Sequence, residues 1–421
     1  MSSAMIHVVG AGLAGLSAAL RLREAGAEVR VYEAAGQAGG RCRSYHDATL
    51  GTTIDNGNHL ILSGNRATLD YLRRLGAEHL LSGPPEPAFP FVDLATGERW
   101  CVRPNAGRLP WWIFDPARRV PGTRALDYLG PVRLLWARSD ASIADAIDCS
   151  SRLYDGLWRP VLLAALNTDP REGSAALAAA IMRETLMAGG HACRPLVATE
   201  GLAAAFIDPA LERLRASGSA VQFGRRLRAI SFAAQRVEAL DFADGPLRLG
   251  GSDAVVLAVP PWVATSLVPR LEAPSEFRAI VNAHFRVDPP RDLAPMTGVV
   301  NGTAEWIFSF RDRLSVTISG ADRLIDVPRD ILAHDIWQDV SAVTGLAATL
   351  PPWQIIKERR ATFAALARED AKRPPATTSW DNLVLAGDWT ATGLPATIEG
   401  AIRSGNRAAA LALKATERAT S

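Results

Sequence analysis

The sequence predicts an α/β protein of two lobes: a Rossmann-type domain built on a parallel sheet, and a second domain of mixed sheet and helix. Three observations carry this prediction. The chain opens with a complete βαβ unit at residues 6–32, buried-strand patterns return at residues 254–259 and 382–386, and Pro- and Trp-rich sequence lies between them. The chain therefore leaves its first domain and comes back to it, so we expect both domains to be discontinuous.

The opening βαβ unit has clear internal boundaries. A short strand at residues 6–9 precedes a helix at residues 13–25, and a second strand follows at residues 28–32. Strands of a parallel sheet are buried on both faces, which explains their nearly continuous apolar character. Gly26 falls where the helix should end in a left-handed turn. A doubly wound sheet is expected to begin here.

The second domain is expected to form in two excursions from the first. Residues 83–138 are rich in Pro and Trp, and residues 141–186 have a mostly helical pattern. A helix is predicted at residues 329–343, after four strands. These strands are expected at residues 279–287, 296–301, 306–311 and 315–319.

The chain returns to the first domain in two places. Strand patterning at residues 220–236 precedes the buried strand at 254–259, and a helix at residues 397–413 follows the last strand. The expected division is a cofactor-binding domain of residues 1–75, 196–262 and 364–421, and a substrate-binding domain of residues 76–195 and 263–363.

Composition and charge exclude several functional classes. The 421 residues are 48% hydrophobic, and 46 Lys and Arg against 44 Asp and Glu leave a net charge of +2, too little to hold nucleic acid. No stretch approaches the roughly 18–20 apolar residues that span a bilayer, and no signal peptide is expected. The four cysteines form no CxxC pair and the seven histidines form no HxxxH or HExxH motif, so we expect a reducing cytoplasm and no metal.

A GxGxxG motif of Gly10, Gly12 and Gly15 stands between the first strand and the first helix. Gly10 permits a tight turn, Gly12 lets backbone N–H groups approach a pyrophosphate, and Gly15 allows close helix–strand packing. Glu33 ends the second strand about 20 residues downstream, where a carboxylate accepts hydrogen bonds from a ribose diol and repels a 2′-phosphate. The pattern predicts a dinucleotide site that disfavours NADP; a glycine turn without a ligand is the alternative.

Further residues extend this site. Gly40 and Arg41 belong to a Gly-Gly-Arg turn suited to presenting a guanidinium to a phosphate or a flavin edge, with a surface salt bridge as the alternative. Gly387 and Asp388 follow the last strand, where the carboxylate can bind ribitol hydroxyls. Ile398 opens the last helix, whose positive end can offer N–H groups to the pyrimidine side of a flavin.

These motifs resemble the flavin-dependent amine oxidase and phytoene desaturase superfamily, whose members combine GxGxxG, Glu and GGR with a C-terminal GD and EGA. Three segments are similar to its squalene-associated FAD-dependent desaturase-like group: residues 55–65 (DNGNHLILSGN), 385–390 (LAGDWT) and 393–401 (GLPATIEGA). The resemblance covers the whole chain and implies an amine oxidase-like fold that binds FAD. Leu227 is also expected to bind FAD. Because no cysteine follows Cys193, non-covalent binding is expected.

The resemblance further implies that hydroxysqualene loses its hydroxyl group to give squalene, as in the hydroxysqualene dehydroxylases of hopanoid pathways, with reduced FAD as hydride donor. Hydroxide is a poor leaving group, so an acid must protonate or hydrogen-bond the oxygen as the bond breaks. Asp55 and His59 are the titratable residues nearest in sequence to the Gly-Gly-Arg turn, and either could supply the proton if burial raises its pKa. The alternatives are a turn or cap role for Asp55 and a core or supporting role for His59.

Two other functions compete with this one. An isoprenoid desaturase or an amine oxidase would use oxidised FAD and remove a hydride from its substrate. A lipid carrier of the same fold would have lost FAD, and the retained Gly10, Gly12, Gly15, Glu33 and Asp388 argue against that loss. The sequence does not identify the electron donor that reduces FAD.

A thirty-carbon isoprenoid should remain in the bilayer, so we expect peripheral contact with the inner face of the cell membrane. Residues 110–114 (PWWIF) supply aromatic and aliphatic groups suited to the interface, and Arg118 and Arg119 follow closely enough to meet anionic head groups. The alternative is that Trp111 and Trp112 fill the core of the inserted lobe.

Overall fold

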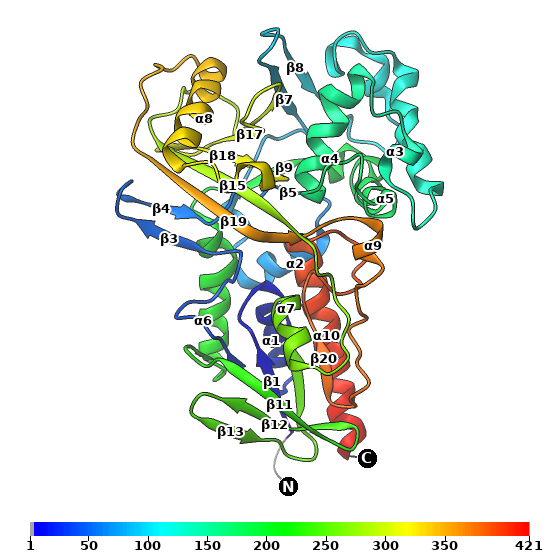
Figure 1. The fold of residues 1–421 in the computed structure, drawn as a ribbon, viewed down its shortest axis with the longest axis vertical. Helices are drawn as coiled ribbons and strands as arrows, with labels where there is room; N and C mark the ends of the chain where they lie inside the picture. Colours follow the sequence, from blue (N-terminus) through cyan, green and yellow to red (C-terminus); the bar gives the residue numbers. More distant parts are fainter. Residues whose placement is uncertain (1–3, 421) are drawn as a thin grey trace.

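A five-stranded parallel sheet forms the centre of the lower lobe in Figure 1, a computed structural model that describes residues 4–420. The strands come from the beginning, the middle and the end of the chain, which is the discontinuity that the sequence predicts. Their order is β10 (Val221–Gln222), β2 (Glu28–Tyr32), β1 (Met5–Val9), β14 (Ala254–Leu257) and β20 (Leu383–Leu385).

The two faces of this sheet are covered differently, because successive side chains of a strand point to opposite faces. In β14, Ala254 and Val256 pack among residues of the helices α1 (Leu13–Glu24), α6 (Asp208–Ala216) and α10 (Ile398–Thr420). Val255 and Leu257 pack on the other side, with residues of an antiparallel sheet. That sheet consists of β11 (Leu227–Ala233), β12 (Arg236–Phe242) and β13 (Gly245–Arg248).

The predicted βαβ unit is confirmed almost to the residue. Gly26 follows α1 in the left-handed region, with a φ of 82°, as expected at the end of a helix. The strand pattern at residues 220–236 is instead divided between β10 and β11. Gly224, with a φ of 71°, turns the chain between them, and its N–H donates to the Ala35 carbonyl.

A seven-stranded mixed sheet forms the second lobe, as the strand predictions for residues 279–319 require. Within residues 4–420, β16 and β7 are the one parallel pair of neighbouring strands in this sheet, and the other pairs are antiparallel. The order is β19 (Trp353–Phe363), β15 (Phe277–Arg286), β18 (Arg313–Ile318), β17 (Trp306–Ser309), β16 (Met296–Val300), β7 (Phe89–Asp93) and β8 (Arg99–Val102).

The faces of this second sheet also differ. Helix α8 (Arg329–Thr344) buries Ile336 and Trp337 against Val281 and Val316 on one face. The alternate residues of β15 and β18 are polar and belong to the opposite face, and they include Asn282, His284, Ser315 and Thr317, of which the first three are fully buried. The polar face meets residues 56–58, since the Asn282 amide donates to the Asn56 carbonyl at 3.2 Å.

Apart from β7 and β8, the helices of residues 83–138 are 3₁₀-helices, and prolines recur throughout this stretch. No helix within residues 4–420 is long and apolar enough to cross a membrane. The remaining elements are β3 (Ser44–Asp47), β4 (Thr52–Asp55), β5 (Ile61–Leu62), α2 (Arg66–Leu75), β6 (Leu81–Ser82), α3 (Ile143–Ala146), α4 (Arg159–Leu166), α5 (Ala175–Glu184), β9 (Pro195–Ala198), α7 (Pro261–Leu267) and α9 (Ala367–Asp370), with the 3₁₀-helices η1 (Glu78–Leu80), η2 (Trp111–Phe114), η3 (Pro116–Arg118), η4 (Ala125–Trp136), η6 (Leu186–Ala188), η7 (Gly190–Ala192) and η9 (Ala321–Leu324) and the π-helices η5 (Tyr154–Trp158) and η8 (Ala203–Ile207).

Candidate functional site

The glycine motif forms a cradle at the start of α1. Gly10 has a φ of 105°, and a Cβ atom there would lie 2.3 Å from the Ala258 carbonyl oxygen. A Cβ at Gly15 would lie 1.9 Å from the Gly10 carbonyl oxygen, whereas one at Gly12 would project into open space. No side-chain hydrogen bond caps α1, and its first turn carries no acidic residue. The N–H groups at this helix start are therefore arranged to receive an anion such as a pyrophosphate.

Glu33 lies beside this cradle. Its carboxylate accepts hydrogen bonds from the backbone N–H groups of Ala11 and Ala35, each at 2.8 Å. The Gly39 N–H donates to the Ala11 carbonyl at 2.8 Å, so the Gly-Gly-Arg turn runs alongside the GxGxxG loop. Gly40 has a φ of 58°, and a Cβ atom added there would lie 3.6 Å from the Gly12 Cα. The structure thus brings the N-terminal candidate residues together around one loop.

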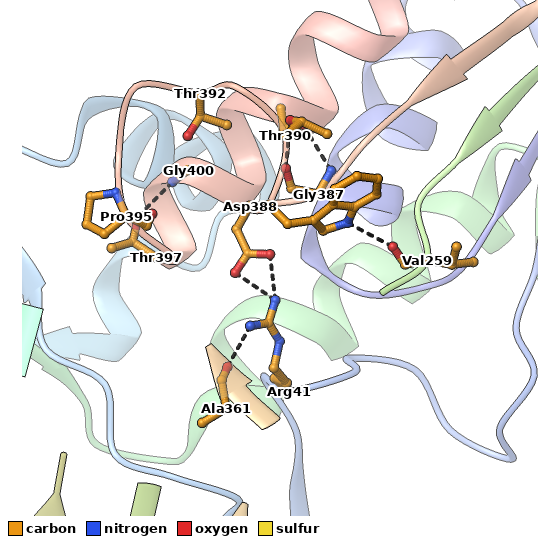
Figure 2. A network of polar contacts seen from close by, with 12 residues as sticks. Arg41, Val259, Ala361, Gly387, Asp388, Thr390, Thr392, Pro395, Thr397 and Gly400 are labelled. Atoms are coloured by element: carbon orange, nitrogen blue, oxygen red, sulfur yellow. Dashed lines mark hydrogen bonds and ion pairs between the residues drawn. The ribbon is translucent and has the colours of Figure 1, made fainter. Parts of the chain in front are cut away.

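Arg41 connects this turn to the C-terminal motif (Figure 2). Its Nη2 atom donates to both carboxylate oxygens of Asp388, at 2.6 and 2.7 Å, and its Nη1 atom donates to the Ala361 carbonyl at 2.6 Å. The Asp388 side chain is 7% exposed and the Arg41 side chain is 45% exposed. The ion pair is therefore partly buried, and it holds β19 of the second lobe next to both cofactor motifs.

The turn after β20 is held in a conformation that needs glycine. Gly387 has a φ of 152°, and a Cβ there would lie 2.4 Å from Nε1 of Trp389. The Trp389 indole donates to the Val259 carbonyl at 2.9 Å, and the Gly387 N–H donates to Ser404 Oγ at 2.9 Å. These contacts hold the backbone of the turn in place and so fix the position of the Asp388 carboxylate.

Arg373 supports the same turn, and no motif in the sequence identifies it. Its buried guanidinium donates to the backbone carbonyl oxygens of Asp388 and Thr390 and to Thr392 Oγ1. It also lies 4.9 Å from the centre of the Phe363 ring. Arg373 therefore positions the Asp388 segment.

The start of α10 has the geometry expected of an N-terminal binding site. Thr397 Oγ1 accepts a hydrogen bond from the Gly400 N–H at 3.0 Å, which caps the helix and leaves the N–H groups of Ile398 and Glu399 without a partner inside it. The Glu399 side chain points elsewhere, because its carboxylate accepts hydrogen bonds from the N–H groups of Ala67 and Thr68. Glu399 caps α2 and so anchors the start of α10 against it.

Asp55 is buried and occupied by hydrogen bonds. Its Oδ1 atom accepts from Ser44 Oγ at 2.5 Å and from the Leu202 N–H at 2.8 Å. Burial raises the pKa of Asp55, and the hydrogen bonds from Ser44 and Leu202 and the charge of Arg313 offset part of that increase. The Asp55 carboxylate therefore holds the distant Leu202 backbone rather than a local turn beside Gly57, and its pKa is raised in the direction that a general acid needs.

His59 has a different environment. Protein covers most of its surface, and no hydrogen bond or ion pair within residues 4–420 joins it to Asp55. Burial, with the nearby positive charge of Arg41, lowers the pKa of His59 to about 4. The imidazole is therefore neutral at pH 7, where it can donate or accept a hydrogen bond but holds no excess proton.

Leu227 lies at the start of β11 and is buried beside its partner Phe242. Two residues earlier, the Arg225 N–H donates to the Glu33 carbonyl at 2.8 Å, so this strand begins next to the expected ribose end of the cradle. The Arg225 guanidinium stacks 4.8 Å from the centre of the Phe242 ring. Arg225 is a further candidate for binding the cofactor at this end. The sequence around it contains no motif that indicates such a role.

A chain of amide hydrogen bonds lies between residues 55–59 and the polar face of the second sheet. Asn58 Nδ2 donates to Thr317 Oγ1 at 3.1 Å, and Thr317 in turn donates to Asn282 Oδ1 at 2.8 Å. Asn58 Oδ1 is buried and has no partner within the described part of the chain. The DNGNH segment is thereby tied to the substrate-side sheet.

A small cavity adjoins the Arg41–Asp388 pair. Trp262, Arg360 and Phe363 form part of its wall, and the Arg360 guanidinium lies 4.9 Å from the centre of the Trp262 ring system. The structure contains no group of three or more His, Cys, Asp or Glu residues between positions 4 and 420 that could hold a metal ion. The donors around the cavity and the cradle suit a phosphate-bearing organic cofactor.

The two tryptophans of the predicted membrane segment have opposite surroundings. Trp111 is 66% exposed, whereas Trp112 is 7% exposed and packs edge-on against Tyr128 at 5.0 Å. Arg118 pairs with Asp115 at 3.6 Å, and Arg119 donates to the Ile113 carbonyl at 2.8 Å. Trp112 therefore fills the core of the inserted lobe, and Trp111 does not. The Arg119 guanidinium is engaged by the backbone of the same segment.

The comparisons with known proteins agree with this geometry. Residues 13–413 match the family described as flavin containing amine oxidoreductase. The chain is 56% identical over 414 residues to the hydroxysqualene dehydroxylase of Rhodopseudomonas palustris, with 98% of this chain and 99% of that protein covered. It is 55% identical over 411 residues to that of Sinorhizobium fredii, with 98% and 99% covered. Cyclohexylamine oxidase from Brevibacterium oxydans has a TM-score of 0.71 at 18% identity, with 100% of both chains covered, which confirms the predicted fold.

Proposed function

The chain belongs to the family of flavin containing amine oxidoreductases, and within this family we propose that it is an FAD-dependent hydroxysqualene dehydroxylase. The reaction removes the hydroxyl group of hydroxysqualene and yields squalene and water. The observation that carries the proposal is the 56% identity over 98% of the chain to a protein of that name. The desaturase, amine oxidase and lipid carrier alternatives have no comparable support.

The residues of the cradle fit FAD bound without a covalent link. Gly10, Gly12 and Gly15 give the pyrophosphate access to the start of α1, and Glu33 accepts hydrogen bonds from the adenosine ribose. The supporting observation is the open space at Gly12, beside a helix start that no side chain caps. Leu227 borders the adenosine end of the same site.

The flavin end of the cofactor would lie between the Gly-Gly-Arg turn and the start of α10. Gly40 brings the backbone close to the cradle, and Arg41 and Asp388 stand where phosphate and ribitol groups pass. Gly387 allows the turn that presents Asp388, and the Ile398 N–H points from the positive end of α10. The N–H groups at the start of α10 would stabilise negative charge on the pyrimidine side of the ring system.

Reduced FAD, when bound, supplies the hydride that replaces the hydroxyl group. The protein must therefore assist departure of the oxygen, which leaves as water once it has received a proton. Asp55 and His59 are the proposed acid side of the site. Burial raises the pKa of Asp55, which favours its protonated form, and the neutral imidazole of His59 can donate its N–H to the oxygen.

The proposed function also suggests where the protein is located and how its chain divides into domains. We place the protein in the cytoplasm, at the inner face of the cell membrane, where a thirty-carbon substrate is available and where its four unpaired cysteines stay reduced. The proposed cofactor domain comprises residues 1–75, 196–262 and 364–421, and the substrate domain comprises residues 76–195 and 263–363.

The test is to supply hydroxysqualene to the purified flavoprotein in two redox states under anaerobic conditions. With reduced flavin we expect squalene in the lipid extract, and with oxidised flavin we expect no reaction. A more unsaturated isoprenoid formed with oxidised flavin would favour the desaturase alternative. Purified protein that holds no flavin would favour the carrier.

A further inference from the structure

Large apolar side chains are exposed mainly in one part of the molecule. Ten of them are at least 37% exposed within the described chain, and six of these ten lie between residues 109 and 136. This corner of the second lobe lies between β8 and α3, at the end of the molecule opposite to both termini (Figure 1). The six are Leu109, Trp111, Phe114, Leu126, Leu129 and Trp136.

Two short helices present these side chains together. In η2, the rings of Trp111 and Phe114 lie 6.3 Å apart. In η4, Leu126 and Leu129 are three residues apart and therefore lie on the same side of a 3₁₀-helix. The buried contact of Trp112 with Tyr128 at 5.0 Å fastens η2 to η4. The inner sides of both helices thus pack in the core, while their outer sides remain apolar and exposed.

The same corner is strongly basic. Residues 103–138 contain seven arginines and two aspartates, a net charge of +5, although the whole chain carries only +2. The rest of the chain is therefore net acidic. Arg103, Arg108, Arg124 and Arg133 are exposed, and none of them forms an ion pair within residues 4–420. Unpaired positive charge and exposed apolar side chains therefore occur in the same segment of the chain.

We propose that this apolar and basic corner is the docking surface for an anionic lipid bilayer. Apolar and aromatic side chains insert at the depth of the head groups, and the unpaired arginines meet the lipid phosphates. An anionic bilayer satisfies both features at once, because its interface accommodates aromatic and aliphatic side chains and its head groups attract clustered arginines. The proposal rests on the proposed function, because hydroxysqualene dissolves in the bilayer. The apolar and basic corner belongs to the lobe proposed to bind this substrate.

Vesicle flotation tests the docking surface directly. Phosphatidylcholine vesicles are compared with vesicles that also contain phosphatidylglycerol, using the holoprotein. We expect flotation of the wild type with the anionic vesicles, and ~10-fold weaker binding for Trp111→Ser/Phe114→Ser/Trp136→Ser and for Arg108→Glu/Arg133→Glu. Melting temperature and FAD content measured in parallel must stay unchanged for the loss to count.

Matched controls lie on other surfaces of the molecule. Ile331→Ser changes a side chain of α8 that is 48% exposed, and Arg248→Glu changes an exposed, unpaired arginine of β13; both should float like the wild type. Equal binding by the corner variants, or no flotation of the wild type, would overturn the proposal. Unchanged flotation with an altered molar mass in sedimentation would assign the corner to self-association instead.

Activity measurements separate this proposal from the enzymatic one. The corner variants should convert hydroxysqualene presented in detergent micelles at the wild-type rate and lose ~10-fold in rate only with vesicle-embedded substrate. If the wild type forms no squalene in micelles, the proposed function fails, and flotation still decides the docking surface. Equal loss in micelles and vesicles would contradict a docking role.

Discussion

Arg41 and Asp388 are 347 residues apart in the chain, and a single guanidinium nitrogen of Arg41 donates to both carboxylate oxygens of Asp388, at 2.6 and 2.7 Å. The contact joins the Gly-Gly-Arg turn to the segment after the last strand, so the two ends of the chain form one site. The carboxylate is nearly buried, and an unpaired charge in that position is costly. The pair therefore holds the site together as well as shaping it.

Replacing one partner of this pair should cost more than replacing both. Arg41→Gln leaves the buried Asp388 carboxylate without its cation, and we expect the free energy of unfolding to fall by about 2–4 kcal/mol. Arg41→Gln/Asp388→Asn removes the unpaired charge and should recover part of that loss. Urea unfolding of the two single variants and the double variant measures the coupling; additive effects would show that the pair does not stabilise the site.

Glu33→Arg should abolish FAD retention. The substitution replaces an acceptor of ribose hydrogen bonds with a cation that cannot accept them, beside the Ala11 N–H that Glu33 now engages. The flavin-to-protein ratio after gel filtration is the measurement, with Glu28→Arg as control, at the exposed first residue of β2, the strand that Glu33 follows. An unchanged ratio in Glu33→Arg would remove Glu33 from the cofactor site.

Asp55→Asn and His59→Ala should retain FAD but slow the reaction of reduced enzyme with hydroxysqualene. The usual effect of losing a general acid is ~10²-fold or more. Asp55→Asn keeps an oxygen that can accept from the Leu202 N–H, so the local fold should survive. Single-turnover flavin reoxidation measures the rate of each variant, and the slower variant identifies the acid. If neither is slow, the proton comes from another group.

Stability should fall in mild acid because two histidines are neutral in the fold. Burial is the main cause that lowers the pKa of His59 to about 4 and that of His284 to about 3, from 6.5 in the unfolded chain. Their contribution is present above pH 6.5 and is lost as the pH falls towards those values, because the unfolded chain binds the protons first. Glu305, whose pKa burial raises to about 7, gives the opposite slope between pH 4.5 and 7.

The His59 contribution is isolated by comparison with a variant. His59→Ala should reduce the slope of unfolding free energy against pH, between pH 6.5 and 4, by up to about 1.4 kcal/mol per pH unit. Guanidinium unfolding at several pH values gives both slopes. Identical slopes for the variant and the wild type would mean that His59 titrates normally in the fold.

The two neighbouring tryptophans should differ sharply in their effect on stability. Trp112 is buried against Tyr128, so Trp112→Ser should lower the free energy of unfolding by about 3–5 kcal/mol. Trp111 is mostly exposed, so Trp111→Ser should change it by no more than about 0.5 kcal/mol. Thermal unfolding of both variants is the measurement, and a large loss in Trp111→Ser would place that side chain in the core.

The fold is largely predictable from the sequence because its signals are local. The glycine spacing, the buried-strand patterns and Gly26 place β1, α1 and β2 within one or two residues of their observed bounds. The resemblance drawn from the segments at residues 55–65, 385–390 and 393–401 is confirmed by the 56% identity to the dehydroxylase of R. palustris. Such segments are distinctive because each combines turn glycines with polar residues in a fixed order.

The tertiary contacts of the site are not predictable in this way. Arg373 reaches the Asp388 turn from a segment without a motif, and Glu399 caps α2 rather than facing the cradle. Trp111 and Trp112 differ in exposure because successive residues of a short helix point in different directions, and only the packing of η2 on η4 decides which is buried. Which side chains contact each other across long sequence separations depends on how the two lobes pack together.

The most direct test of the account is an anaerobic single turnover of the reduced flavoprotein with hydroxysqualene. Stopped-flow absorbance follows flavin reoxidation, and chromatography of the quenched mixture measures squalene. The account predicts flavin reoxidation that depends on hydroxysqualene and yields one squalene for each flavin oxidised. Flavin that remains reduced in the presence of hydroxysqualene, or reoxidation without squalene, would contradict it.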